Sequence, residues 1–361
     1  MKTDTLLTGQ DRTGQDRTGQ DYNLGLALLR IWMSFEVLLI HFWRSGEVSM
    51  TKFVLFSMTR SWAVPAFMFT AFLLTGEIFF RQDTAKLKKR FYRIGVPQLG
   101  WTIIYFFCFL LGSLLEHSMF ARQGVGALAH TLLGQLLSGW VINTPMWFLV
   151  DLMILTLLFA VIYFTLENLV ALRLTVCLGC LALVLQYTGI NLMLFENFDE
   201  TFKYTLGSIF EMLPVACLGL VFARYNILSK LAAARGKSLI ICVVCLGIVL
   251  YLERAGILRP APGFFYPGLF LVLAPSLITL IFYLLPLENS PRWLSAFTKN
   301  MARYTLGIYC LQMLVGLFVN RIVTRNDGST FAKCAIIYLL CLLLSFLIAK
   351  IPGKWSKYLV E

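Results

Sequence analysis

The stretch LGLALLRIWMSFEVLLIHFW, residues 24–43, decides the fold class of this chain. It is nearly all apolar and has the length, about 20 residues, that an α-helix needs to cross the hydrocarbon core of a bilayer. The whole chain has the same character, since 58% of its 361 residues are hydrophobic and 14% are charged. Soluble domains are about 45–50% apolar and about 25% charged. The sequence therefore predicts a polytopic membrane protein and excludes soluble enzymes and disulfide-stapled secreted domains.

Further apolar stretches bring the prediction to about ten transmembrane helices in an all-α fold. With both termini in the cytoplasm, the segments on the inner side carry 20 Lys and Arg and those on the outer side carry 10. This is the positive-inside pattern of a multi-pass protein of the cytoplasmic (inner) membrane. The net charge of +12 is then loop charge, and no nucleic-acid partner is expected. The predicted spans are 24–43, 61–80, 96–115, 147–166, 172–190, 205–223, 238–253, 265–285, 302–321 and 334–351.

The chain divides into a tail and one membrane domain. Residues 1–22 contain the repeat TGQDR-TGQDR-TGQD, whose composition cannot bury apolar area, so a disordered tail is expected there. Residues 23–361 form a single transmembrane domain. Whether copies of it associate into a homo-oligomer is left open.

Two CxxC patterns, Cys177 with Cys180 and Cys242 with Cys245, lie in apolar spans without a nearby histidine. Free cysteine packs like a small hydrophobic residue, and this interpretation is favoured over a zinc site. No metal is predicted.

Ionisable residues inside a span are costly and are therefore candidate functional residues. The first span holds Arg30, Glu36 and His41. At about 100° per residue, Arg30 and His41 fall on one face of a helix, whereas Glu36 lies about 240° away from Arg30. The competing interpretation is that Arg30 and His41 each reach for the nearest membrane interface.

Arg90 and Arg93 belong to a basic inner loop, RQDTAKLKKRFYRIGVP, and their spacing would let them bind one phosphate together. They are equally explained as anchors for lipid headgroups. Asp151, one turn after Trp147, is expected near the outer interface at a depth similar to that of His41, where it could orient the imidazole. Its alternative role is a buried ion pair, and Glu211 is a second candidate. His130 is expected on the surface of an interfacial amphipathic helix.

Several of these features together resemble the membrane acyltransferase-3 family. They are the arginine and histidine separated by ten residues in the first span, the Arg90-Phe-Tyr-Arg93 pair and the count of about ten spans. Three further segments are similar to family motifs: FMFTAFLLTGEIFF (67–80), WFLVDL (147–152) and ARYTLGIYCLQ (302–312). One departure is Gln312, where many members carry a histidine.

The resemblance implies a role for each matching residue. His41 corresponds to the catalytic histidine and Arg30 to its paired arginine, while Arg90 and Arg93 correspond to the pair associated with the acyl-CoA donor. The family acylates, usually acetylates, hydroxyls of cell-envelope glycans. The resemblance thus implies acetyl-CoA as donor substrate and a polysaccharide or glycolipid as acceptor. The alternative is a transporter or exporter of a lipid-linked glycan or small solute, since prolines within spans and buried charges also suit a substrate pathway.

Overall fold

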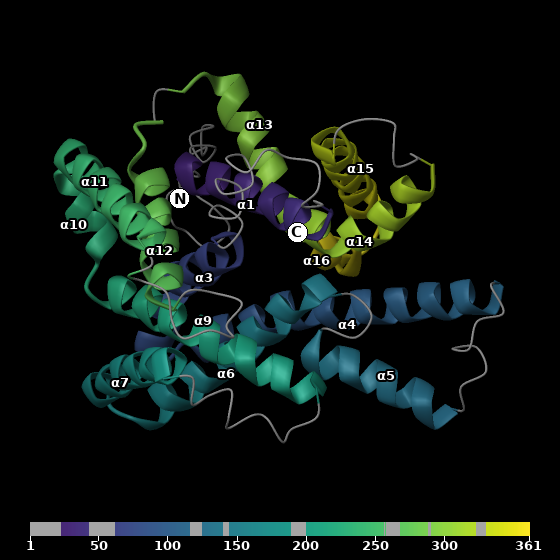
Figure 1. The fold of residues 1–361 in the computed structure, drawn as a ribbon, viewed down its shortest axis with the longest axis horizontal. Coiled ribbons are helices and arrows are strands. Elements are labelled where there is room, and N and C mark those ends of the chain that lie inside the picture. The colour runs from purple at the N-terminus through teal and green to yellow at the C-terminus, as the bar shows by residue number, and fades with distance from the viewer. Residues whose placement is uncertain are drawn as a thin grey trace, which may run out of the picture.

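The computed structural model describes residues 23–42, 62–115, 125–139, 144–188, 200–255, 257, 268–287, 290–322 and 330–361. The predicted repeat tail and His117 lie outside these residues. Throughout the described part the regular elements are helices (Figure 1). They are α1 Leu24–Phe42, α3 Ala63–Phe80, α4 Thr84–Leu115, α5 Val125–Ser138, η3 Thr144–Met146, α6 Trp147–Thr165, α7 Asn168–Thr188, α9 Glu200–Arg224, α10 Ile227–Ala233, α11 Arg235–Arg254, α12 Gly268–Leu284, α13 Arg292–Arg303, α14 Thr305–Ile322, α15 Thr330–Lys350 and α16 Lys354–Val360.

Ten of these helices correspond to the ten predicted spans. Within the described residues, nine are long and apolar enough to cross a membrane, and α12, with 17 residues, is a shorter apolar helix. The all-α polytopic fold predicted from the apolar stretches is confirmed. The ends of most helices fall within a few residues of the predicted ends, because apolar runs bounded by charge and proline mark them.

The exception is α4, which begins at Thr84 rather than at 96 and contains Pro97. Its first turn is capped, since the Asp83 carboxylate accepts a hydrogen bond from the Lys86 amide at 2.9 Å. The turn between α3 and α4 is therefore only Arg81–Asp83. The basic segment that the sequence presented as a loop is helical because Lys, Leu and Arg are good helix formers.

Helix α3 stands at the centre of the bundle and packs against α1, α4, α6, α9 and α12. Its contact with α9 is close: a Cβ at Gly219 would lie 2.7 Å from the Phe69 carbonyl oxygen, and one at Gly76 would lie 2.5 Å from Cβ of Ala223. Small residues let helix backbones approach in this way inside a membrane. Figure 1 shows α1, α13, α14 and α15 on one side of α3, with α6, α7 and α9 on the other.

Helix α1 is enclosed by α12, α13, α14 and α15 in addition to α3. Trp32 stacks on Phe282 of α12 at 5.5 Å between ring centroids. At the Phe42 end of α1, the Phe42 ring lies directly against Gly316, so that α14 packs closely on α1 there.

Helix α5 and the short η3, which lie between α4 and α6 in the chain, both contact the bundle. Helix α5 runs beside α4 (Figure 1), and its Gln135 side chain is fully buried while the Gln135 carbonyl accepts a hydrogen bond from Gln98. The short η3 then carries the chain to α14, where the Pro145 carbonyl accepts a hydrogen bond from the Tyr309 hydroxyl. His130 of α5 is exposed, as expected.

Candidate active site

His41 and Arg30 occupy the two ends of one face of α1. Arg30 is exposed and His41, the penultimate residue of the helix, is partly buried. Eleven residues of α-helix separate them by about 16 Å along the axis. Between them Ser34 and Val37 are each 1% exposed, and the Ser34 hydroxyl is hydrogen-bonded to that of Tyr338 on α15 at 3.0 Å. The face that carries both residues is therefore packed against a neighbouring helix in its middle.

Glu36, which the helical geometry excludes from this face, is buried on another side of α1. Its carboxylate accepts a hydrogen bond from the Trp32 indole at 3.0 Å.

Arg90 is directed into the bundle from the basic end of α4. The residue is 9% exposed. Its Nε donates to the Thr156 hydroxyl at 3.0 Å, and its Nη1 donates to the Thr75 hydroxyl at 2.6 Å. The guanidinium carbon lies 5.0 Å from the centre of the Phe72 ring. Arg90 therefore connects α4 to both α3 and α6. Lysine could not do the same, because it lacks the planar set of donors that a guanidinium group has.

The third nitrogen of the Arg90 guanidinium remains without a partner among the described residues. Arg90 Nη2 is buried and has no hydrogen bond within the described residues. Arg93, three residues further along α4, is exposed. The two arginines lie on one helix as predicted, but only Arg93 is accessible from the surface.

Asp151 is fully buried near the start of α6, and neither carboxylate oxygen has a hydrogen bond in the described part of the chain. Two polar groups of α9 lie near this carboxyl, the Ser208 hydroxyl and the Glu211 carboxyl. A buried carboxylate without hydrogen bonds is unfavourable in a packed interior. Such a group is a candidate to hold a substrate hydroxyl or an ordered water.

The start of α6 and the end of α1 both contact α14. The Phe148 ring packs edge-on against the Tyr309 ring at 5.8 Å between centroids. The Phe42 ring of α1 lies against Gly316, seven residues further along α14.

Asp151 follows Phe148 by about one turn of α6. That Asp151 and His41 lie at one depth, and that Asp151 orients the imidazole, stay predictions.

The structure thus separates the predicted residues into two groups. Arg30 and His41 lie on α1, whereas Arg90, Arg93 and Asp151 lie on the α4–α6 pair, and α3 packs against both groups of helices. The sequence reasoning missed Thr75 and Thr156, which hold Arg90. The only signal for them was a hydroxyl within an otherwise apolar run.

Gln312 of α14 is the residue at which the sequence departs from the pattern that it resembles. It is fully buried, and neither its amide nitrogen nor its amide oxygen has a hydrogen bond in the described residues.

The described residues contain no cluster of three or more His, Cys, Asp or Glu side chains that could hold a metal ion. All nine cysteines are free; Cys177 and Cys180 are exposed on the apolar surface of α7, whereas Cys242 is buried and Cys245 is partly buried.

Comparison with known proteins assigns the chain to a protein family. Residues 23–350 match the profile of the acyltransferase-3 family, described as an acyltransferase domain. The chain belongs to this family. The match starts at the first residue that the structure describes and covers all ten apolar helices, so the membrane bundle is itself the acyltransferase domain. No curated protein and no solved structure matches the chain.

Proposed function

We propose that this membrane acyltransferase transfers an acyl group, acetyl in the favoured case, from cytosolic acyl-CoA to a hydroxyl of a cell-envelope polysaccharide or glycolipid. In this proposal the protein resides in the cytoplasmic (inner) membrane with both termini inside. The observation that supports it most is the arrangement on α1, where Arg30 and His41 mark the two ends of one helix face in an acyltransferase domain. The family also favours an enzyme over the alternative of an exporter.

The proposed donor site lies at the basic end of α4. Acyl-CoA is strongly anionic, and guanidinium groups bind phosphates through charge-assisted hydrogen bonds. Arg93 is exposed there and can reach such a ligand, as can Arg30 at the corresponding end of α1. Arg90 is held by Thr75 and Thr156, and its Nη2 is the donor that it still has available.

His41 is proposed as the general base. Its imidazole removes the proton of an acceptor hydroxyl as the hydroxyl oxygen attacks the thioester carbonyl carbon. The carbon–sulfur bond then breaks, and the CoA thiolate leaves and takes up the proton from the imidazolium. Imidazole suits both steps because it titrates near neutral pH. Asp151 is proposed to orient this imidazole or to accept a hydrogen bond from bound substrate.

The proposal requires a route for the thioester past the middle of α1. Ser34 and Val37 are packed there, and the hydrogen bond between Ser34 and Tyr338 closes the face against α15. Movement of α15 relative to α1 would open the face between Arg30 and His41. The proposed reaction therefore alternates between a closed state, with this hydrogen bond made, and an open state, with it broken.

The test uses membrane vesicles from cells that produce the protein, because these contain the native acceptor. Vesicles receive acetyl-CoA labelled in the acetyl group, and label in the glycan and glycolipid fraction is measured together with released CoA thiol. His41→Ala is expected to abolish transfer while the protein inserts and folds normally. His130→Ala, which removes an exposed histidine from α5, is the matched control and should transfer normally. Full transfer by His41→Ala would remove His41 from the mechanism.

A further inference from the structure

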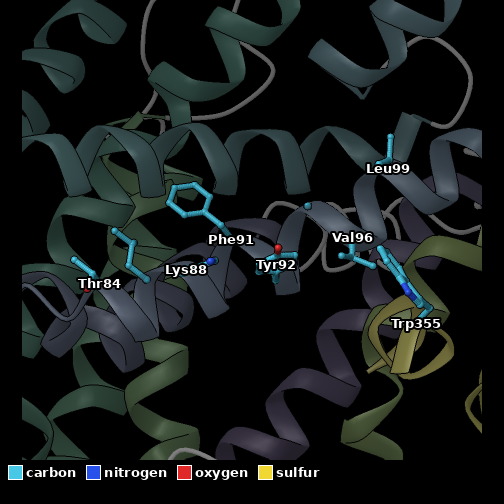
Figure 2. Close-up of a pocket in the computed structure, with 9 residues that line it drawn as sticks. Thr84, Lys88, Phe91, Tyr92, Val96, Leu99 and Trp355 are labelled. Atoms are coloured by element: carbon cyan, nitrogen blue, oxygen red, sulfur yellow. The ribbon is translucent and has the colours of Figure 1, made fainter. Parts of the chain in front are cut away.

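A groove runs along the face of α4 that points away from the bundle, opposite the face that carries Arg90. It has a volume of about 550 Å³, and Lys88, Tyr92, Val96 and Leu99 of α4 line it together with Trp355 of α16. Figure 2 shows Lys88, Tyr92 and Val96 following one another along the helix, with the Trp355 ring facing Val96. A second hollow of about 280 Å³ continues from it and adds Tyr358.

The two helices that form the groove are fixed to each other. The Trp101 indole donates a hydrogen bond to the Leu359 carbonyl at 2.8 Å. Gly100 leaves room for the Leu359 side chain, since a Cβ at that position would approach it to 2.5 Å. These contacts hold the two walls of the groove next to each other.

The lining changes character along α4. Lys88 supplies a cation near the start of the helix, whereas the residues from Val96 onward are apolar. Beyond the groove the exposed apolar face continues with Ile103 and Phe107. Tyr92, Tyr358 and Trp355 lie between the two parts, and tyrosine and tryptophan favour the boundary between headgroups and hydrocarbon.

We propose that this groove binds an anionic phospholipid from the leaflet that surrounds the α3–α4 turn, which is the cytoplasmic leaflet in the predicted orientation. The lipid phosphate pairs with the Lys88 ammonium, and an acyl chain lies over Val96 and Leu99 under the Trp355 ring. Basic grooves at the inner ends of membrane helices recognise anionic headgroups in this way. Charge complementarity selects an anionic lipid over a zwitterionic one.

The same lining disfavours acyl-CoA as the occupant. Acyl-CoA carries several phosphates and a polar nucleotide, whereas the groove offers one ammonium group and mostly apolar and aromatic walls. Arg90, which the proposed function assigns to the donor, points into the bundle on the other side of α4. The lipid site is thus independent of the proposed transfer chemistry, and failure of either proposal leaves the other standing.

The first experiment measures lipid binding by the purified full chain with native mass spectrometry. Detergent-solubilised protein is mixed with phosphatidylglycerol or with phosphatidylcholine of the same acyl chains. Wild-type protein should retain phosphatidylglycerol in preference, and Lys88→Gln should reduce that preference about fivefold, which corresponds to about 1 kcal/mol for one cation at a membrane surface. Lys230→Gln, which removes an exposed lysine from α10, is the control and should change nothing.

A second pair of variants tests the groove without changing charge. Gly95 lines the groove, and a Cβ there meets no atom within 4 Å, so Gly95→Leu fills the groove without a clash in the bundle. Gly247→Leu on α11 meets equally open space and serves as its control. We expect Gly95→Leu alone to release the lipid while both proteins keep the wild-type melting temperature in detergent.

A third pair of variants tests whether lipid binding needs the tryptophan in the groove or is affected by removal of any exposed tryptophan. Trp355 is 68% exposed and Trp293 of α13 is 70% exposed, but only Trp355 lines the groove. Trp355→Ala should weaken phosphatidylglycerol binding and Trp293→Ala should not.

Three results would overturn the proposal. They are equal retention of the two lipids by wild-type protein, equal losses in Lys88→Gln and Lys230→Gln, and displacement of phosphatidylglycerol by acetyl-CoA at the Lys88 groove. The last result would make the groove a donor site.

Discussion

Arg90 Nε donates a hydrogen bond to the hydroxyl of Thr156 at 3.0 Å, joining residues that are 66 positions apart in the chain. The bond connects the basic end of α4 to the middle of α6. With the bond from Nη1 to Thr75, it makes a charged residue part of the packed interior. Arg90 and Arg93 therefore differ in role although they share one motif.

Arg90→Ala and Arg93→Ala are expected to separate stability from donor binding. Arg90→Ala leaves the Thr75 and Thr156 hydroxyls without their donor and should lower the free energy of unfolding by about 1.5–3 kcal/mol, the usual range for a hydrogen bond to a charged group. Arg93→Ala should leave stability unchanged and raise the Kd for acetyl-CoA roughly tenfold, by loss of one phosphate contact. Thermal unfolding in detergent and titration calorimetry measure the two effects.

Thr156 provides the matched control for this pair. Thr156→Ser retains the hydroxyl and should behave like wild type, whereas Thr156→Val should lose part of the stability lost in Arg90→Ala. Equal stability of Arg90→Ala and Arg93→Ala would contradict the structural role of Arg90.

Gly219 should tolerate no side chain, because a Cβ there would lie 2.7 Å from the Phe69 carbonyl oxygen on α3. Gly219→Leu is expected to push α9 away from α3 and to destabilise the protein by more than about 3 kcal/mol, since overpacking against backbone cannot relax through a rotamer change. Gly207→Leu on the same helix meets open space and should be nearly neutral. Melting temperatures of the two variants check the prediction, which fails if both are equally stable.

Asp151→Asn should keep or raise stability and still reduce transfer. The substitution retains the shape of the side chain and removes a buried carboxylate that has no hydrogen bond, so the folded state loses an unfavourable group. If the carboxylate holds a substrate group, transfer should fall by at least about tenfold, equivalent to about 1.4 kcal/mol of transition-state stabilisation. Labelled acetyl transfer and thermal unfolding are measured on the same preparation. A destabilised Asp151→Asn would instead indicate that the carboxylate has a structural partner.

Asp83 makes the first turn of α4 sensitive to acid. The hydrogen bond from the Lys86 amide holds the pKa of the Asp83 carboxyl below its ordinary value of 3.8. Because the pKa is lower in the folded state, the cap stabilises the helix fully above pH about 4 and its contribution is lost as the pH falls through the lowered pKa. Hydrogen exchange of peptides spanning residues 83–88 should therefore accelerate on acidification, after correction for intrinsic rates.

Two substitutions identify the source of this effect. Asp83→Asn keeps a side-chain oxygen for the Lys86 amide and should remove the pH dependence. Lys86→Gln removes the ion pair of 3.4 Å but keeps the amide, so the pH dependence should persist. Loss of the dependence in Lys86→Gln would assign it to the ion pair instead of the cap.

The sequence predicted the bundle well, because each apolar run is bounded by charges or prolines that mark a membrane span. It failed where tertiary contacts override local pattern. The charge of the Lys and Arg run before Pro97 favours a loop, although α4 begins at Thr84. The contact between η3 and Tyr309 could not be predicted either, because it joins residues that are 164 positions apart in the chain.

The candidate site was predictable only in part. The shared face of Arg30 and His41 follows from helical periodicity, which needs no knowledge of neighbouring helices. The burial of Arg90 could not be predicted, because its partners Thr75 and Thr156 come from two other helices. Single hydroxyls inside apolar helices do not reveal which charge they meet until the helices are assembled.

The continuity of α4 has a mechanical consequence. The helix runs without a break from Thr84, past Arg93 and Pro97, to Tyr105. The Tyr105 hydroxyl donates to the Cys310 carbonyl at 2.8 Å and accepts from the Leu314 amide at 3.0 Å. A displacement of the basic end of α4 would therefore also move Tyr105 and the α14 backbone bonded to it, because no loop lies between Thr84 and Tyr105.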